Sequence, residues 1–212
     1  MKHKSQLINR RGLFVTAAGA AIATASTRGR ASSVASKGHI KQSIVSWCFS
    51  SMGDKWDIEK QCQVANELGC VSIELTQPTN WPILKKHGLT CAIAPNGMPG
   101  APYVKGFNNL KYQEEVITRT TKMIDACAAA HIPAVIAFTG FKWRNAEDSS
   151  SGAMTDEEAF DNCVVGLKKI AGHAEKQNVT ICLEHLNTRD DSHPMKGHPG
   201  YFGDDVDRCV DL

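Results

Sequence analysis

VTICLEHLN, residues 179–187, is the stretch that decides the fold. Its first five residues, VTICL, are apolar apart from one threonine, which is typical of a short strand buried on both faces of a sheet. Glu184 follows at once. Because burying an unpaired charge is costly, we expect this carboxylate to lie at the rim of the sheet, facing a cation or a substrate.

Strand-like and helix-like segments alternate on the N-terminal side of this stretch. The predicted strands cover residues 40–49, 70–75, 89–95, 134–138 and 179–184, and the predicted helices cover residues 57–68, 80–87, 109–130, 155–174 and 206–212. Asp57 is placed to cap the first helix and Gly69 to end it. Thr155 and Glu158 have the spacing of a capping box, in which each side chain satisfies the backbone N–H of the other residue.

Five strand–helix pairs in strict alternation predict a parallel sheet with helices outside it. Two arrangements of such a sheet are possible, an open doubly wound sheet and a closed (β/α)8 barrel. No G-x-G-x-x-G follows the first strand, which weakens the dinucleotide-binding version of the open sheet. A barrel needs eight strands and about 250 residues, and this chain ends within its fifth unit.

Composition excludes some classes of protein. The chain has 212 residues, of which 42% are hydrophobic and 22% charged, and no run of roughly 18 apolar residues that could span a bilayer. Residues 1–35 contain six basic residues and no acid, and removing those six leaves 18 basic against 22 acidic residues. Since nucleic-acid binding needs a clustered basic face, we expect neither a nucleic-acid partner nor a stable membrane anchor.

The basic start has the layout of an export signal. Arg10-Arg11 precede Gly12-Leu13-Phe14 and an alanine-rich apolar stretch, which resembles the twin-arginine class of signals. We therefore predict a signal peptide and linker over residues 1–35 and a periplasmic or extracytoplasmic location. A disordered basic tail and an uncleaved anchor are the alternatives. Cleavage after Ala25, Ala31 or Ala35 fits the pattern equally.

The eight cysteines fall mostly inside predicted helices and strands, and none forms a C-x-x-C pair. This placement predicts small core residues rather than disulfides or a thiolate zinc site. Folding before export would agree with this prediction, because the reducing cytosol favours free thiols.

Glu184 and Glu74 are the leading candidates for chemistry, because each ends a predicted strand. In a barrel the carboxyl ends of all strands face one mouth, so both carboxylates would point into it. Oxygen and imidazole ligands suit Mg²⁺, Mn²⁺ or Zn²⁺. The alternative is that each acid begins a solvated loop. Arg189, in the long polar loop of residues 187–203, could hold a substrate carboxylate, and Lys142 and Arg144 are further candidate anion contacts.

ICLEHLNTRDD, residues 181–191, resembles the middle of the hydroxypyruvate isomerase family, which belongs to the xylose isomerase-like TIM barrels. The segments GLKKIAGHAEKQNV and HPGYFGDD flank it, and GCVSIEL, KKHGLTCAI and VIAFTG fit the same family in order. The resemblance covers about residue 40 to residue 212 and is most specific in the E-x-L-N motif. It implies that residues 40–212 form about five βα units of a partial (β/α)8 TIM barrel.

The resemblance also implies a metal-dependent isomerase. Glu184 matches the family's first metal-binding glutamate, which also transfers a proton, and the metal would be Mg²⁺, Mn²⁺ or Zn²⁺. The reaction would interconvert hydroxypyruvate and tartronate semialdehyde through an enediolate. We predict Asn187, Arg189 and Glu74 as substrate-binding residues. The expected partners are a small keto-acid or sugar substrate and, in a homo-oligomer, further copies of the chain.

The chain departs from the family's pattern in its later ligands. In the family these lie on strands six to eight and include a D-x-Y-H aspartate and a second glutamate, neither of which this sequence contains. We therefore expect the 212-residue chain to be inactive alone. A sugar epimerase or other ketose isomerase, a metal-dependent nuclease of the same fold, and an exported sugar-binding protein are the alternatives.

Overall fold

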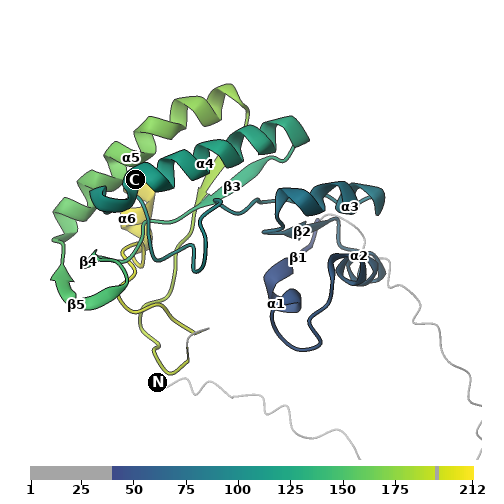
Figure 1. Ribbon diagram of the computed structural model, residues 1–212, viewed down its shortest axis with the longest axis horizontal. Helices are drawn as coiled ribbons and strands as arrows, with labels where there is room; N and C mark the ends of the chain where they lie inside the picture. Colours follow the sequence, from purple (N-terminus) through teal and green to yellow (C-terminus); the bar gives the residue numbers. More distant parts are fainter. Residues whose placement is uncertain (1–39, 194–195) are drawn as a thin grey trace, which may run out of the picture. The chain divides into compact units, whose positions relative to one another are not determined.

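The computed structural model of the chain describes residues 40–193 and 196–212 (Figure 1). The predicted signal peptide and linker, residues 1–35, lie outside the described residues. Among the described residues, none of the helices combines the length and the apolar character that crossing a bilayer requires.

Four short strands belong to parallel pairs. Strand β1 (Ser43–Val45) pairs with β2 (Ser72–Glu74), and β3 (Ala134–Ala137) pairs with β6 (Thr180–Leu183). The segment 90–94 joins the two pairs through parallel bridges, Ser72 with Thr90 and Ala94 with Val135. The order β1, β2, segment 90–94, β3, β6 confirms the predicted parallel α/β alternation.

All five strands are shorter than predicted, and two of them differ most from the prediction. Segment 89–95 makes only isolated bridges at Thr90 and Ala94. The predicted strand over residues 40–49 is wrong after Val45, because Ser46–Ser50 form helix α1 instead. Phe49 in this helix stacks on Trp56, with ring centroids 5.1 Å apart, and this local aromatic pair favours a turn over an extended chain.

The remaining helices follow the sequence pattern closely. They are α2 (Ile58–Glu67), α3 (Trp81–Lys86, preceded by a 3-10 turn, Pro78–Asn80), α4 (Leu110–Ala130), α5 (Asp156–Lys176) and α6 (Val206–Asp211). Asp57 accepts a hydrogen bond from the backbone of Lys60, which confirms it as the cap of α2. Gly69 follows the helix with φ at +75°, a left-handed conformation that favours glycine.

The capping box of α5 is only half formed. The Thr155 hydroxyl accepts a hydrogen bond from the backbone N–H of Glu158, as predicted. The Glu158 carboxylate instead pairs with Arg144, at 3.1 Å. The reason is that an arginine on a neighbouring strand offers two charged donors, which outcompete one backbone N–H.

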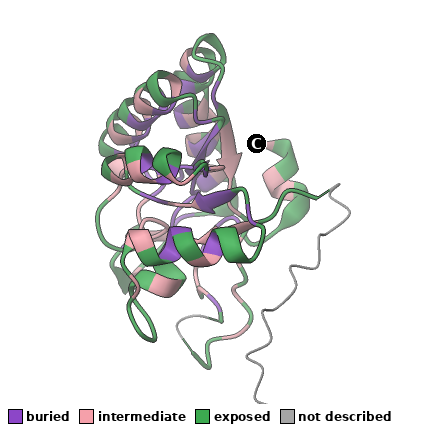
Figure 2. Ribbon diagram, turned by 90° about the vertical axis from the view of Figure 1, so that its right-hand side faces the viewer, coloured by how far each residue is buried: buried purple, intermediate pink, exposed green. Residues whose placement is uncertain are grey.

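A hydrophobic core lies between the helices and one face of the sheet. Helix α2 packs on β2, α4 on β3 and α5 on β6, and α4 and α5 lie side by side (Figure 1). Ile73, Val135 and Ala137 are fully buried in this core. Figure 2 shows that buried residues follow the strands and the helix faces turned toward them.

Strands β4 (Trp143–Asn145) and β5 (Asp148–Ala153) form an antiparallel hairpin that the sequence pattern does not predict. Strand β5 reads DSSSGA, which lacks the β-branched and aromatic residues typical of strands. Side-chain hydrogen bonds compensate, since Ser151 accepts from the backbone N–H of Asn145.

All eight cysteines are free. Five are buried, namely Cys62, Cys70, Cys91, Cys127 and Cys163, and this placement confirms the core interpretation for most of the set. Burial raises the pKa of Cys127 to about 12, so this thiol stays protonated. Cys48 is the exposed exception.

Candidate active site at the carboxyl edge of the sheet

Glu184 lies immediately after β6, at the carboxyl end of the strand. Its backbone N–H donates to the carbonyl of Ala137 at 2.9 Å, so it continues the ladder with β3. Ile181 and Leu183 pack against the core under the helices. Because side chains alternate along a strand, Glu184 lies on the opposite face of the sheet. Its side chain is half-buried there.

Glu74 has the same relation to β2. It is the last residue of the strand and is half-buried, and Ile73 before it points into the helix-side core with no exposed surface. Alternation therefore places Glu74 on the face away from the helices. The two predicted carboxylates lie on one face, at the carboxyl ends of two parallel strands.

The electrostatics link these two residues. Burial raises the pKa of the Glu184 carboxyl, the neighbouring His185 opposes the rise, and the negative charge of Glu74 adds to it. Glu74 is thus close enough to disfavour a second negative charge on this face. A bound cation would relieve that repulsion, because it attracts both negative charges.

A cluster of apolar side chains lies on the same face of the sheet as the carboxylates. Ile136, Phe138 and Tyr201 form a second buried cluster, against which Leu75 and Leu186 pack. Ile136 alternates with Val135 and Ala137 along β3, so it belongs to the same sheet face as Glu184. A half-buried carboxylate beside such an apolar cluster is a setting that supports acid–base chemistry near neutral pH.

The long polar loop of residues 187–203 is held by main-chain hydrogen bonds in its second half. Tyr201 forms an antiparallel bridge with Phe141, and the backbone N–H of Phe202 donates to Gly140 at 2.9 Å. Glycine is required where the chain approaches β4, since a Cβ at Gly200 would lie 2.4 Å from the Trp143 ring. This part of the loop is therefore a fixed wall of the site.

Asn187 and Arg189 lie in the first half of the same loop. The Asn187 amide donates to the carbonyl of Lys196 at 2.8 Å, and its oxygen accepts from the backbone N–H of Arg189. Asn187 thus shapes the turn that carries Arg189. The Arg189 side chain is exposed, and its guanidinium has no hydrogen bond or ion pair within the described part of the chain.

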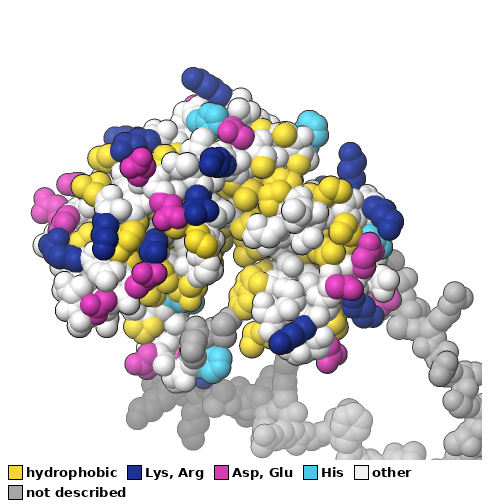
Figure 3. Space-filling model, in the orientation of Figure 1, with side chains coloured by type: hydrophobic (Ala, Val, Ile, Leu, Met, Phe, Trp, Pro, Cys, Tyr) yellow, Lys and Arg dark blue, Asp and Glu magenta, His cyan; other side chains and the backbone are white. Residues whose placement is uncertain are grey.

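The other predicted anion contacts are already engaged. Arg144 makes two hydrogen bonds to the Glu158 carboxylate, and the Lys142 ammonium lies 5.8 Å from the Trp143 ring centroid. On the face drawn in Figure 3, basic and acidic side chains are interspersed rather than gathered into one basic patch.

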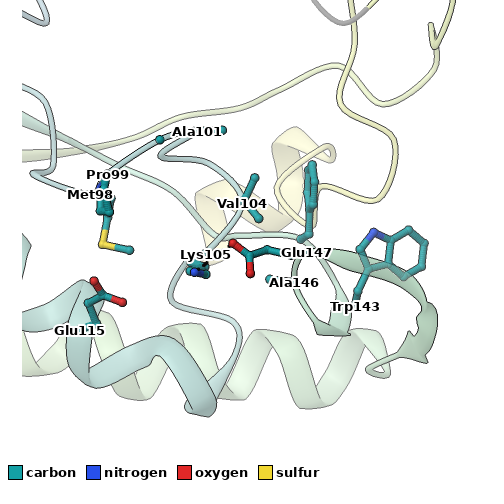
Figure 4. Close-up of a pocket in the computed structure, with 11 residues that line it drawn as sticks. Met98, Pro99, Ala101, Val104, Lys105, Glu115, Trp143, Ala146 and Glu147 are labelled. Atoms are coloured by element: carbon teal, nitrogen blue, oxygen red, sulfur yellow. Dashed lines mark ion pairs between the residues drawn. The ribbon is translucent and has the colours of Figure 1, made fainter.

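A separate pocket of about 400 Å³ lies beside the hairpin (Figure 4). Its walls are the loop over residues 98–105, the segment 141–147 and Glu115 of α4. Its three charged lining residues are paired, Lys105 with Glu147 at 3.1 Å and Glu115 with Arg119 at 2.8 Å. Neither Glu74 nor Glu184 lines it, so this pocket is not the predicted site.

A divalent metal fits this site only in part. The carboxylates of Glu184 and Glu74 are suitable oxygen donors for Mg²⁺, Mn²⁺ or Zn²⁺. Within residues 40–193 and 196–212, however, no group of three or more His, Cys, Asp or Glu side chains could hold a metal ion. Glu184 and Glu74 are thus two possible oxygen ligands, and the described residues do not add a third of these types beside them.

Sequence reasoning missed Tyr201 and Thr139. Tyr201 is almost fully buried, and its hydroxyl joins two residues that lie 17 and 62 positions away in the sequence. No local pattern encodes such distant contacts. The only signal was the position of Tyr201 in HPGYFG, directly after the polar loop.

Parallel strands with helices on one face, and carboxylates on the other face at the carboxyl edge, define this chain as part of a TIM-barrel type of α/β protein. Comparison of the sequence with known families defines the class of protein more narrowly. The chain belongs to the xylose isomerase-like TIM barrel family, whose model matches residues 62–211.

Solved structures share this fold. An AP endonuclease of family 2 from Brucella melitensis is 17% identical, with a TM-score of 0.55 over 77% of this chain and 59% of that one. The IOLI protein with a bound zinc atom is 14% identical, with a TM-score of 0.58 over 81% of this chain and 57% of that one. A D-psicose 3-epimerase from Clostridium cellulolyticum H10, solved with D-tagatose, is 15% identical, with a TM-score of 0.52 over 70% and 53%.

The chain thus spans less than two thirds of the length of these proteins. At these identities the likeness establishes the fold alone. Among curated proteins, none matches this chain.

Proposed function

We propose that this chain carries part of the active site of a metal-dependent isomerase of small hydroxy-keto compounds, most specifically a hydroxypyruvate isomerase. One observation carries the proposal. Glu184, in the family-like E-x-L-N motif, lies with Glu74 on the inner face of the sheet at its carboxyl edge. Active sites of TIM barrels are built at this edge.

The proposed reaction is a proton transfer between adjacent carbons. Glu184 removes a proton from the hydroxymethyl carbon of hydroxypyruvate, and the electron pair forms the C=C bond of an enediolate. The proton then returns to the neighbouring carbon, and the hydroxyl proton moves between the two oxygens, which gives tartronate semialdehyde without any net redox change. Burial raises the pKa of Glu184, and a raised pKa brings a carboxylate closer to the strength such a base needs.

The other predicted residues have binding roles in this proposal. Arg189 presents an exposed guanidinium that can grip the substrate carboxylate with two parallel hydrogen bonds. Asn187 and Glu74 complete the substrate side of the site. Glu184 would be one ligand of the divalent metal, and a metal held there would supply stabilisation of negative charge on the substrate oxygens. In this proposal the remaining metal ligands and the second proton-transfer group would have to come from outside the described residues.

The experiment is an assay of hydroxypyruvate conversion with Mn²⁺ or Mg²⁺, on the 212-residue chain and on the longest product of the same reading frame. We expect turnover only where a downstream D-x-Y-H motif and a later glutamate are present, and we expect Glu184→Gln to abolish it. Turnover by Glu184→Gln at the wild-type rate would contradict the proposal.

A sugar epimerase of the same fold is the second candidate. The similar structures include a D-psicose 3-epimerase, and the proposed proton transfer serves an epimerase equally well. Assays with ketohexoses beside hydroxypyruvate separate the two: the better substrate by kcat/KM identifies the class.

We also propose export through the twin-arginine signal, with residues 1–35 as signal and linker. The support is the Arg10-Arg11 pair before an apolar, alanine-rich stretch. Changing both arginines to lysine should keep the protein in the cytoplasm, whereas the unchanged chain should reach the extracytoplasmic fraction. Equal export of both forms would reject this.

A further inference from the structure

Two main-chain segments, at Glu184 and at Thr139, meet at the hydroxyl of Tyr201. The hydroxyl donates to the backbone carbonyl of Glu184 at 2.8 Å and accepts from the backbone N–H of Thr139 at 3.1 Å. Thr139 in turn accepts, at its hydroxyl, from the backbone N–H of Gly203 at 2.8 Å. The ends of β3 and β6 and the returning loop are therefore joined by side-chain hydrogen bonds.

These contacts are shielded from water. Tyr201 is 1% exposed and Thr139 is fully buried. Burial also raises the pKa of the Tyr201 phenol, which keeps the hydroxyl protonated and able to donate. A hydrogen bond in such surroundings fixes its partners more firmly than one in water, because no water molecule competes for either group.

The regular ladder between β3 and β6 stops at this point. The last ladder hydrogen bond is from the N–H of Glu184 to the carbonyl of Ala137. Beyond it, within the described part of the chain, the carbonyl of Glu184 accepts no hydrogen bond from a neighbouring strand. It accepts one from the Tyr201 hydroxyl instead. The main chain of Glu184 is thus held on both sides, by the neighbouring strand and by Tyr201.

We propose that Tyr201 is a positioning residue, whose hydroxyl fastens the main chain of Glu184 to that of Thr139 and so fixes the direction of the Glu184 carboxylate. The role in catalysis rests on the function proposed above. Tyr201 itself does not touch the reacting atoms.

Tyr201→Phe removes the hydroxyl and keeps the ring. Tyr103→Phe is the matched control, because Tyr103 packs on Phe138 in the same cluster and its hydroxyl bonds to none of the described residues. NMR of the full 212-residue chain gives a readout that needs no substrate. In Tyr201→Phe we expect the Thr139 amide to exchange about tenfold faster, with a shift of the Glu184 carbonyl carbon, and in Tyr103→Phe neither change.

Two results would overturn the positioning role. One is an unchanged Thr139 exchange rate and Glu184 carbonyl shift in Tyr201→Phe. The other is an equal acceleration of amide exchange throughout α4 and α5, which would show that Tyr201 stabilises the whole fold and not the site.

Enzyme kinetics give a second readout. They are measured on whichever protein, the 212-residue chain or a longer product of the same reading frame, converts substrate. Tyr201→Phe should lower kcat roughly tenfold to a hundredfold with KM unchanged, because the base is misdirected while the substrate still binds. Tyr103→Phe should keep both constants. A Tyr201→Phe variant with wild-type kcat would reject the role. A wild-type protein without isomerase or epimerase turnover would reject the proposed function, and the NMR comparison would then decide the positioning role independently.

Discussion

Glu184 is a half-buried carboxylate whose pKa is raised by burial and by the charge of Glu74. The folded protein therefore binds its proton more tightly than the unfolded chain does. Its contribution to stability falls as the pH rises from the ordinary glutamate range through the raised pKa, since the folded state must then carry the unfavourable charge. In the absence of a cation, this residue opposes folding at neutral pH.

We predict that Glu184→Gln makes the metal-free protein more stable at pH 7 and leaves its stability near the wild-type value below the ordinary glutamate pKa. Urea unfolding at the two pH values measures the difference. In a Glu74→Gln background the gain should be smaller, because one cause of the raised pKa is gone. A gain that is independent of pH would contradict the assignment.

Gly140 occupies a position that only glycine suits. Its φ is +98°, and a Cβ there would lie 2.5 Å from the Asn108 amide oxygen and 2.6 Å from the backbone nitrogen of Gly106. We predict that Gly140→Ala destabilises the protein by about 2 to 5 kcal/mol, from backbone strain and overpacking together.

Gly172 is the control for this substitution. It lies in α5, and a Cβ there would meet nothing within 4 Å. Gly172→Ala should stabilise the protein by about 0.5 to 1 kcal/mol, because alanine loses less backbone freedom in a helix. Urea unfolding of both variants provides the test, and equal effects would refute the close approach at Gly140.

The residues of the candidate site differ in how far the sequence reveals them. Glu74 and Glu184 could be predicted because each ends an apolar strand, and a local pattern encodes that position. The role of Tyr201 could not be predicted, because its partners are Glu184 and Thr139 and the contacts form only after folding. The ion pair between Arg144 and Glu158 could not be predicted for the same reason.

At the scale of elements, α5 shows which half of a capping motif matters. Thr155 accepts the backbone hydrogen bond that caps the helix, whereas Glu158 makes a surface ion pair with Arg144. We predict that Thr155→Ala costs about 1 kcal/mol, in the usual range for a lost cap. Glu158→Ala should cost less, about 0.5 kcal/mol, since exposed ion pairs contribute little.

Urea unfolding of the two variants, with Arg144→Ala as the matched partner, measures these costs. Glu158→Ala and Arg144→Ala should have similar effects, because they remove the same ion pair. A cost for Glu158→Ala equal to or above that of Thr155→Ala would indicate a complete capping box instead.

Most elements could be predicted from the sequence, whereas helix α1 and the β4–β5 hairpin could not. Helices α4 and α5 carry an apolar stripe at helical spacing over 21 residues each, and that signal outweighs local exceptions. Helix α1 and the β4–β5 hairpin have no such periodicity. Individual side-chain contacts, such as Phe49 on Trp56 in α1 and Ser151 with the backbone of Asn145 in the hairpin, accompany their conformation instead.

At the scale of the whole molecule, the thiols report how the described chain is packed. Cys48 is exposed, whereas Cys62, Cys127 and Cys163 are fully buried and burial raises their pKa values. We predict that the exposed thiol of Cys48 reacts fastest with an aromatic disulfide reagent in the native protein, ahead of the half-buried Cys182 and Cys209, because the reaction requires access to the thiolate. The fully buried three should react only on unfolding.

Cys48→Ser should remove the rapid phase and leave the slow one. Rapid labelling of Cys62, Cys127 or Cys163, located by mass spectrometry of the labelled protein, would contradict the packing between the helices and the sheet.

The arrangement of the sheet brings Glu74 and Glu184 to one face although 110 positions of sequence separate them. Titration with Mn²⁺ of a chain labelled with ¹³C at the glutamate carboxyls tests this most directly, because paramagnetic broadening depends steeply on distance. We predict that Glu74 and Glu184 broaden together at the lowest Mn²⁺ concentrations, and that Glu184→Gln abolishes the effect at Glu74. Broadening of other glutamates while Glu184 stays sharp, or of Glu74 undiminished in Glu184→Gln, would contradict it.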